Sequence, residues 1–207
     1  MKHSRNRVAA LSDGVFAFAA TLMVVDLGTA LDLSKLDIQL SFFISFGIAF
    51  FVMMLLWKVH YNFFQRTKYV DNWIIGANTL LLFTVLFYLF PLKTLANSIV
   101  MQKALSFNDL AQLFIIYGFG FLLIFTAYSF MYWRAYQKDT SNANRLQLLF
   151  YCYHFGIFAI TGLASLITAY FKVGIGIGLP GFMYATLGLS CYFNGVVFRK
   201  NHPEVFP

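Results

Sequence analysis

The chain has 207 residues, of which 60% are hydrophobic, 20% are aromatic and only 11% are charged. Soluble domains carry about 25% charged residues, so the composition predicts an integral membrane protein and leaves no room for a soluble domain. The net charge of +7 forms no basic patch, and membrane proteins are often basic for reasons of topology, so no nucleic-acid partner is expected.

Six apolar segments follow one another along the chain, and each is near or above the roughly 20 residues that a spanning helix needs. Their connections are short, so residues 1–207 are predicted to form a single six-helix transmembrane domain of the all-α class. The segments run over Val8–Leu31, Leu40–Val59, Trp73–Leu95, Leu110–Trp133, Leu146–Phe171 and Val173–Phe198.

The first segment carries two carboxylates, Asp13 and Asp26, with Thr21 as the clearly polar residue between them. A carboxylate at the centre of a membrane helix costs roughly 2.5–3.5 kcal/mol on insertion scales. A helix that tolerates two of them is expected to face protein or water, so this segment is the predicted functional element. The acids lie thirteen residues, hence ~20 Å, apart along the helix axis, and they cannot act together as an acid–base pair.

A helical wheel with ~100° per residue places Phe18, Leu22, Val25 and Thr29 within about 60° of one another. Asp13 falls roughly 150° from the middle of this stripe, so it is expected to point into neighbouring protein. Small residues also recur at close-packing spacing and would allow another helix to approach. They are Ala10, Gly14 and Ala17.

The second and third segments offer partners for a buried carboxylate near the inner membrane face. Trp57 and His60 are three residues apart and therefore share a helix face, and Asn78 lies in the inner third of the third segment. Their indole, imidazole and amide groups suit a carboxylate at the depth of Asp13. The alternative reading is that the three are unconnected interfacial residues. Further along, Pro91 is expected to kink or end the third helix.

The remaining segments contribute no recognisable catalytic or metal-binding pattern. The sixth opens with glycines at positions 174, 176 and 178, and no strand precedes them, which favours a flexible or close-packed helix start over a phosphate loop. Neither G-x-S-x-G nor H-E-x-x-H occurs, and the two cysteines lack metal-ligand spacing. The chain is therefore not expected to be an enzyme, and no cofactor or bound metal is predicted.

Lysine and arginine positions predict the orientation, because they concentrate in cytoplasmic loops. With the N-terminus inside, eleven lie on the inner side and four on the outer side, so both termini are predicted to be cytoplasmic. The inner ones are Lys2, Arg5, Arg7, Lys58, Arg66, Lys68, Arg134, Lys138, Arg145, Arg199 and Lys200, and the outer ones are Lys35, Lys93, Lys103 and Lys172.

The first segment resembles a known family. The run Arg7-x-x-x-Leu11-Ser12-Asp13-Gly14 is similar to the R-x-x-x-F-S-D-G signature that opens the first helix of the transmembrane protein 175 potassium channels. Residues 15–22, the W-x-x-H of Trp57 and the N-x(11)-F-P that ends at position 91 also fit. The likeness covers the first ninety-odd residues, and the last three segments match in number and hydropathy.

The resemblance implies a potassium-selective cation channel of modest selectivity, in which four copies assemble and helix one of each lines a central conduit. By position, the apolar constriction would comprise Phe18, Leu22 and Val25, with a hydroxyl layer from Thr21 and with Thr29 on the same stripe. Phe18 stands where the family generally has isoleucine or leucine. The motif residues Arg7, Ser12, Asp13, Trp57, His60 and Asn78 would hold helix one in place.

Two other functions remain open at this point. A proton-coupled membrane carrier could use the intramembrane Asp13 and His60, although the two halves of the chain show no repeat. A structural membrane protein could use its acids for packing alone. For the channel, the expected partners are further copies of the chain and the lipid bilayer, the permeant ion is potassium, and the expected location is a prokaryotic inner (plasma) membrane.

Overall fold

The computed structural model describes residues 3–30, 36–100, 106–140 and 145–203, and this part of the chain is almost entirely helical. Apolar side chains repeat with helical spacing through long segments, and the connections between them are brief, so each segment becomes one helix. The main helices are α1 (Arg5–Ala30), α2 (Leu36–Arg66), α3 (Asn72–Val100), α4 (Phe107–Lys138), α5 (Arg145–Tyr170) and α7 (Thr186–Asn201).

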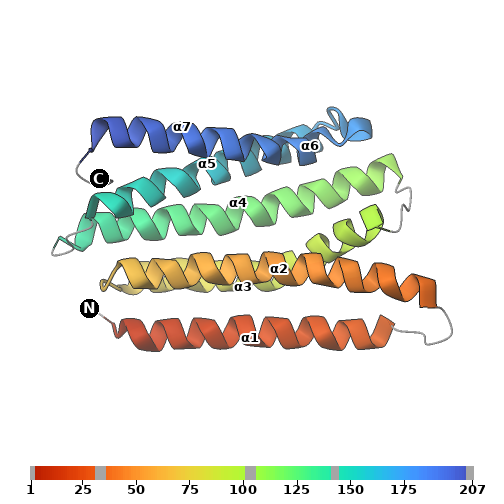
Figure 1. Ribbon diagram of the computed structural model, residues 1–207, viewed down its shortest axis with the longest axis horizontal. Coiled ribbons are helices and arrows are strands. Elements are labelled where there is room, and N and C mark those ends of the chain that lie inside the picture. The colour runs from red at the N-terminus through yellow and green to blue at the C-terminus, as the bar shows by residue number, and fades with distance from the viewer. Residues whose placement is uncertain (1–2, 31–35, 101–105, 141–144, 204–207) are drawn as a thin grey trace.

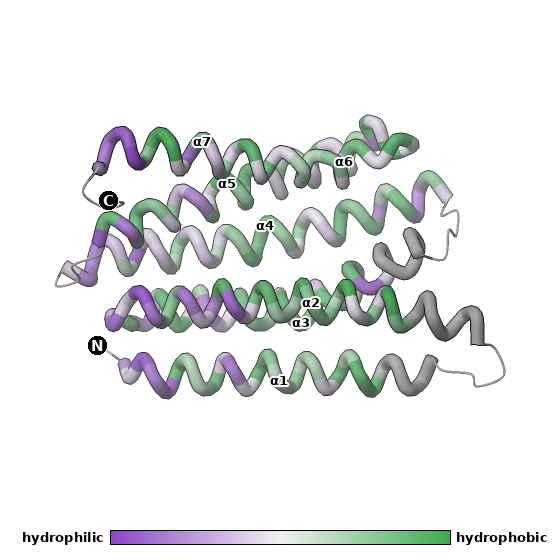
Figure 2. The backbone as a smooth tube through the Cα atoms, viewed as in Figure 1, coloured by the Kyte–Doolittle hydropathy of each residue, from purple (hydrophilic) through white to green (hydrophobic). Residues whose placement is uncertain are grey.

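Within the described residues, six stretches are long and apolar enough to cross a membrane. They confirm the prediction of an all-α membrane protein with six spans. The sixth stretch, Leu179–Asn201, includes the short α6 (Leu179–Phe182) together with α7. Figure 2 shows the hydrophilic residues gathered at the end of the bundle where α1 begins and α7 ends, with apolar residues along the middle.

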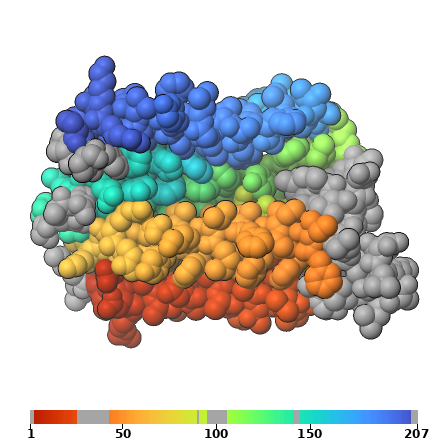
Figure 3. Space-filling view, in the orientation of Figure 1, coloured from red at the N-terminus to blue at the C-terminus, as the bar shows by residue number. Residues whose placement is uncertain are grey.

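The helices form a layered bundle with α1 at one edge and α7 at the opposite edge (Figure 1). α1 packs against α2 and α3, α3 and α5 both pack against α4, and α7 packs against α5. Aromatic side chains fill the centre: Tyr128 and Tyr132 are fully buried, and the Tyr128 hydroxyl donates to the Leu56 carbonyl at 3.0 Å. Because α1 has neighbours on one side only, a long surface of it is left uncovered (Figure 3).

Pro91 lies inside α3 and does not end it, since the helix continues to Val100. The proline lacks an N–H and clashes with the preceding turn, which bends a helix. The last turns of α3 run at an angle to the rest of that helix in Figure 1. Of the two outcomes expected at Pro91, a kink or a helix end, the structure shows the kink.

The predicted sixth helix begins later than expected. Residues 174–178 form a tight turn with a short 3-10 segment, Ile175–Ile177, in which Gly174 and Gly178 adopt the left-handed conformation (φ 64° and 70°). A Cβ on Gly174 would lie 2.6 Å from the Cβ of Leu179. The close approach agrees with the expectation of close packing, but it builds a turn rather than a helix start.

Candidate functional site

One face of α1 is buried, and the spacing of its residues explains why. Ser12, Phe16, Ala19 and Met23 recur every three or four residues and are all buried, at 0–6% exposure. This recurrence is that of a single helix face. That face packs on α2 and α3, so the rotation of α1 about its own axis is fixed by its buried side.

A buried chain of hydrogen bonds joins α1, α2 and α3 at this face. Nε2 of His60 lies 2.7 Å from Oδ1 of Asn78, and Nδ2 of Asn78 donates to Oγ of Ser12 at 3.0 Å. Because an amide oxygen only accepts, Nε2 of His60 is the donor. Oγ of Ser12 in turn donates to the carbonyl of Val8 at 2.9 Å. Three side chains from three helices thus satisfy one another away from water.

Asp13 has a separate partner. Nε1 of Trp57 donates to its Oδ1 at 2.9 Å, so Trp57 and His60, which were expected to serve one carboxylate, serve two different groups. Asp13 itself is exposed in the single chain. It lines a groove of about 380 Å³ between α1 and α2, together with Ala17, Met54 and Trp57. The polar residues are therefore connected, but in two arrangements instead of one.

The stripe predicted for the conduit is uncovered in the single chain. Phe18, Leu22 and Val25 are 57%, 46% and 59% exposed. Thr21 is also exposed, and its Oγ1 donates to the carbonyl of Ala17 at 3.1 Å. The side chains of Thr29 and Asp26 lie outside the described residues. An apolar surface of this length on α1 indicates contact with lipid or with another protein chain.

Arg7 does not join either arrangement. Its side chain is exposed, and it forms no hydrogen bond or ion pair with the other described residues. Its neighbour Arg5 donates from NH1 to the Phe64 carbonyl at 3.1 Å and so attaches the first turn of α1 to the end of α2. Among the described residues, no group of His, Cys, Asp or Glu is suited to a metal ion.

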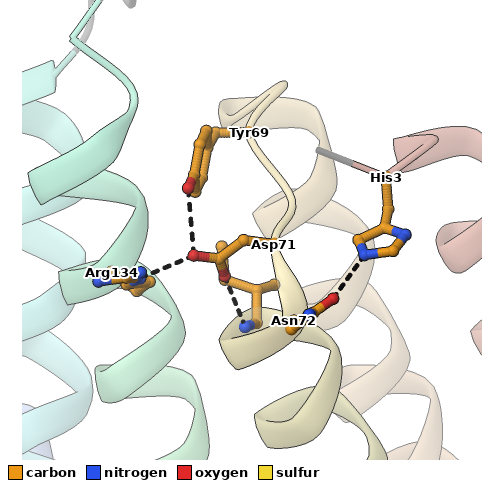
Figure 4. Close-up of polar contacts among 6 residues, drawn as sticks. His3, Tyr69, Asp71, Asn72 and Arg134 are labelled. Atoms are coloured by element: carbon orange, nitrogen blue, oxygen red, sulfur yellow. Dashed lines mark hydrogen bonds and ion pairs between the residues drawn. The ribbon is translucent and has the colours of Figure 1, made fainter. Parts of the chain in front are cut away.

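The connection between α2 and α3 holds a polar cluster that sequence reasoning missed (Figure 4). Asp71 caps α3 by accepting from the Ile74 N–H at 3.0 Å, and its Oδ2 accepts from Arg134 Nε at 2.8 Å and from the Tyr69 hydroxyl at 3.1 Å. An acid directly before an apolar run is an N-cap signal, but nothing in the sequence pairs it with an arginine 63 positions later.

The pKa values of this cluster follow from its contacts. Burial alone would raise the pKa of the Asp71 carboxyl, but the hydrogen bonds from Ile74 N–H, Arg134 and Tyr69 outweigh it and lower that pKa. Desolvation and the hydrogen bond to Asp71 raise the pKa of Tyr69. Asp71 is therefore ionised at neutral pH and forms a salt bridge between α3 and α4 with Arg134.

The start of α1 is tied to the same connection. The His3 ring lies 2.6 Å from Oδ1 of Asn72 (Figure 4). The His3 backbone N–H also donates to the Val70 carbonyl at 2.9 Å. The segment between α2 and α3 thus contacts both the beginning of α1 and the C-terminal part of α4.

The amino-acid sequence of this chain is similar to those of known potassium channels. The family model described as the endosomal/lysosomal potassium channel TMEM175 matches residues 7–91. A potassium channel of Marivirga tractuosa is 33% identical over 151 residues, covering 66% of this chain and 61% of that protein. A potassium channel of a Chryseobacterium species is 28% identical over 130 residues, covering 62% and 63%. The chain thus aligns with less than two thirds of either relative.

Solved structures agree in fold over nearly the whole chain. The crystal structure of the potassium channel MtTMEM175, in a threonine-to-alanine variant bound to a nanobody–MBP fusion, has a TM-score of 0.78 at 26% identity. It covers 94% of this chain and 93% of that one. A lysosomal potassium-selective channel TMEM175 homolog from Chamaesiphon minutus has a TM-score of 0.57 at 22% identity and covers 88% and 97%, a likeness of fold alone. The likeness therefore extends beyond residue 91 to the last three spans.

Proposed function

We propose that this chain belongs to the TMEM175 family and is a potassium-selective cation channel of a prokaryotic inner membrane. It works as a homotetramer in which α1 of each copy lines the conduit. Phe18, Leu22 and Val25 form an apolar constriction, and Thr21 adds hydroxyl oxygens beside it. It needs no cofactor beyond the permeant potassium ion, and both of its termini are cytoplasmic.

One observation carries the proposal: one face of α1 is buried against α2 and α3, and the rest of its surface is exposed in the single chain and includes a carboxylate. Asp13 is exposed in the single chain and lies in the hydrophobic span. A carboxylate turned toward lipid is costly, so this flank of α1 favours contact with another copy or with water. The apolar stripe lies on the other flank of the same helix, which supports a central position for α1.

The constriction acts through hydration. A narrow ring of apolar side chains excludes water and blocks ions, whereas a slightly wider one forces an ion to lose part of its hydration shell. Potassium loses water more readily than sodium, so such a ring favours potassium. Thr21 Oγ1 donates to the Ala17 carbonyl and retains lone pairs with which it can contact a cation. The selectivity is modest, because no cage of carbonyls surrounds the ion.

Two matched pairs of variants test this proposal in liposomes under potassium–sodium gradients. Thr21→Ala is compared with Thr79→Ala, since each threonine is exposed and donates to the carbonyl four residues earlier. Leu22→Ala is compared with Leu80→Ala, since these leucines are 46% and 47% exposed. The α1 variants shift the reversal potential, and the α3 variants do not. Unchanged selectivity in both α1 variants contradicts the assignment.

The same liposomes separate the channel from a proton-coupled carrier. A small cavity of about 110 Å³ is lined by both Asp13 and His60, which is the observation that favours the carrier. A channel passes potassium without a proton gradient and without saturation at high potassium concentration. A carrier shows flux that needs the proton gradient and that disappears in Asp13→Asn, and that result would replace the present proposal.

A further inference from the structure

The turn between α5 and α6, residues 171–178, exposes large apolar side chains. With its flanking residues it covers positions 170–182, which contain one charged side chain, Lys172, and no acid. The large side chains that are 53–71% exposed here are Tyr170, Phe171, Val173, Ile177 and Phe182. A cluster of exposed apolar side chains marks contact with lipid or with another protein. The surface of this turn is therefore poorly suited to water.

The connection between α2 and α3 lies at the opposite end of the bundle and has the opposite character (Figure 1). It follows Arg66 and contains Lys68, which is exposed, and Asp71. Charged side chains favour water, whereas aromatic side chains such as tyrosine concentrate at the interface between membrane and water. The two connections are therefore suited to different surroundings.

The backbone of the α5–α6 turn supplies an independent observation. Five of its N–H groups donate to carbonyls of the turn itself or of the last turn of α5 at 2.9–3.2 Å, and they belong to Phe171, Lys172, Val173, Ile177 and Gly178. Just beyond the turn, the carbonyl of Pro180 accepts from the buried Ser165 hydroxyl at 2.8 Å. Backbone groups near lipid must be satisfied within the protein, because water is scarce there. The turn meets this requirement at each of these groups.

The length of α5 places the turn at the membrane–water interface. α5 has 26 residues and is therefore ~39 Å long, while the hydrocarbon core and both interfaces together measure about 40–45 Å. With Arg145 at one interface, Tyr170 reaches the other, and the turn begins at the next residue. An exposed stripe of α5 with helical spacing leads to the same point, through Ile160, Leu163, Ile167 and Tyr170. The turn continues this apolar stripe.

From these observations we infer that the α5–α6 turn is embedded in the membrane–water interface, where its aromatic and aliphatic side chains contact lipid below the headgroups. Lys172 fits this depth: its Nζ donates to Oδ1 of Asn108 in the first turn of α4 at 2.8 Å, and lysine near a helix end extends its charge toward the polar side of the interface. The inference requires only that the chain spans a membrane. It does not depend on ion conduction, so either proposal can fail without the other.

Spin labels in liposomes test the inference. The label is attached to a single cysteine in the full chain, after Cys152→Ser and Cys191→Ser have removed the native thiols. Ile177→Cys places it on the turn and Ile160→Cys on the middle of α5, and these isoleucines are matched at 71% and 70% exposure. Lys68→Cys places it on the polar connection. Molecular oxygen concentrates in the bilayer and a hydrophilic nickel chelate stays in water, so the ratio of their collision rates with the label reports its depth.

The oxygen-to-nickel ratio at position 177 exceeds that at position 68 and lies below or near that at position 160. Phe182→Cys, at 69% exposure, gives the same result and provides the test if the variant at position 177 does not fold. A ratio on the turn equal to that at position 68 places the turn in water and overturns the inference. Low collision rates with both reagents also overturn it, because a second protein chain would then cover the turn.

Discussion

Replacing Asn78 by leucine tests whether the buried hydrogen bonds hold α1 in place. Asn78 is 3% exposed and bonds both His60, at 1% exposure, and Ser12, at 0%. Leucine has a similar volume, so the substitution removes the two hydrogen bonds and leaves little empty space. Helices α1 and α2 would then lose their shared polar contact with α3.

The two lost bonds differ in cost. Oγ of Ser12 still donates to the Val8 carbonyl and loses only an accepted bond, whereas Nε2 of His60 loses its partner in a buried position. Leaving a buried polar group unsatisfied costs about 1–3 kcal/mol, although single hydrogen bonds in membrane proteins average only ~0.6 kcal/mol. We therefore expect Asn78→Leu to lower the free energy of unfolding by about 2 kcal/mol.

Reversible unfolding in mixed micelles measures this free energy. Thr79→Leu is the matched control, because Thr79 is adjacent, exposed and bonded only within its own helix at Ile75. It should change stability by less than about 0.5 kcal/mol. The double variant His60→Phe with Asn78→Leu removes both partners and should be less destabilised than the sum of the single variants. The reasoning is refuted if the effects of the two single variants add exactly in the double variant. It is also refuted if Asn78→Leu lowers the free energy of unfolding by less than Thr79→Leu does.

The remaining predictions concern other parts of the fold. The pKa of Asp71 is lowered in the folded state, so its ion pair with Arg134 stabilises the fold at pH values above the ordinary carboxylate pKa. This stabilisation is lost as the pH falls through the folded-state pKa. The free energy of unfolding should therefore fall less steeply with decreasing pH in Asp71→Asn than in the wild type. Gly14 has open space around its Cβ position among the described residues, so Gly14→Leu should leave the single chain folded but abolish chemical cross-linking between copies. Gly174→Ala, at φ 64° and against a neighbouring side chain, should lower the thermal midpoint, whereas Gly176→Ala should not, and equal midpoints would contradict this.

Hydropathy and residue type were enough to predict the spans and the residues that meet near the N-terminal half of α1. Asn78, His60 and Trp57 stand out because amide, imidazole and indole groups are rare inside apolar segments. What the sequence could not give is the pairing: Trp57 bonds Asp13, while His60 and Asn78 bond each other. Which donor meets which acceptor depends on the relative height and rotation of three helices, and spacing within one helix does not fix these.

The connection between α2 and α3 shows the same limit. Asp71 precedes an apolar run and is a natural helix cap, but its bond to Arg134 requires α4 to lie beside α3. A cavity of about 400 Å³ among α2, α3, α4 and α5 was likewise not predicted, because its wall comes from four helices. Features built across helices need the tertiary structure.

The division of α1 into two kinds of surface connects the fold with the proposed function. The buried residues from Ser12 to Met23 face α2 and α3, and Leu22 lies next to Met23 on the uncovered side. Adjacent helical residues point ~100° apart, so fixing Ser12 through Asn78 also fixes the direction of Leu22. A turn of α1 by one residue would bury Asp13 where Ser12 now lies and would take Oγ of Ser12 away from Nδ2 of Asn78, so this hydrogen bond opposes rotation of α1. The side chains at the proposed constriction are thus positioned by hydrogen bonds in which they take no part.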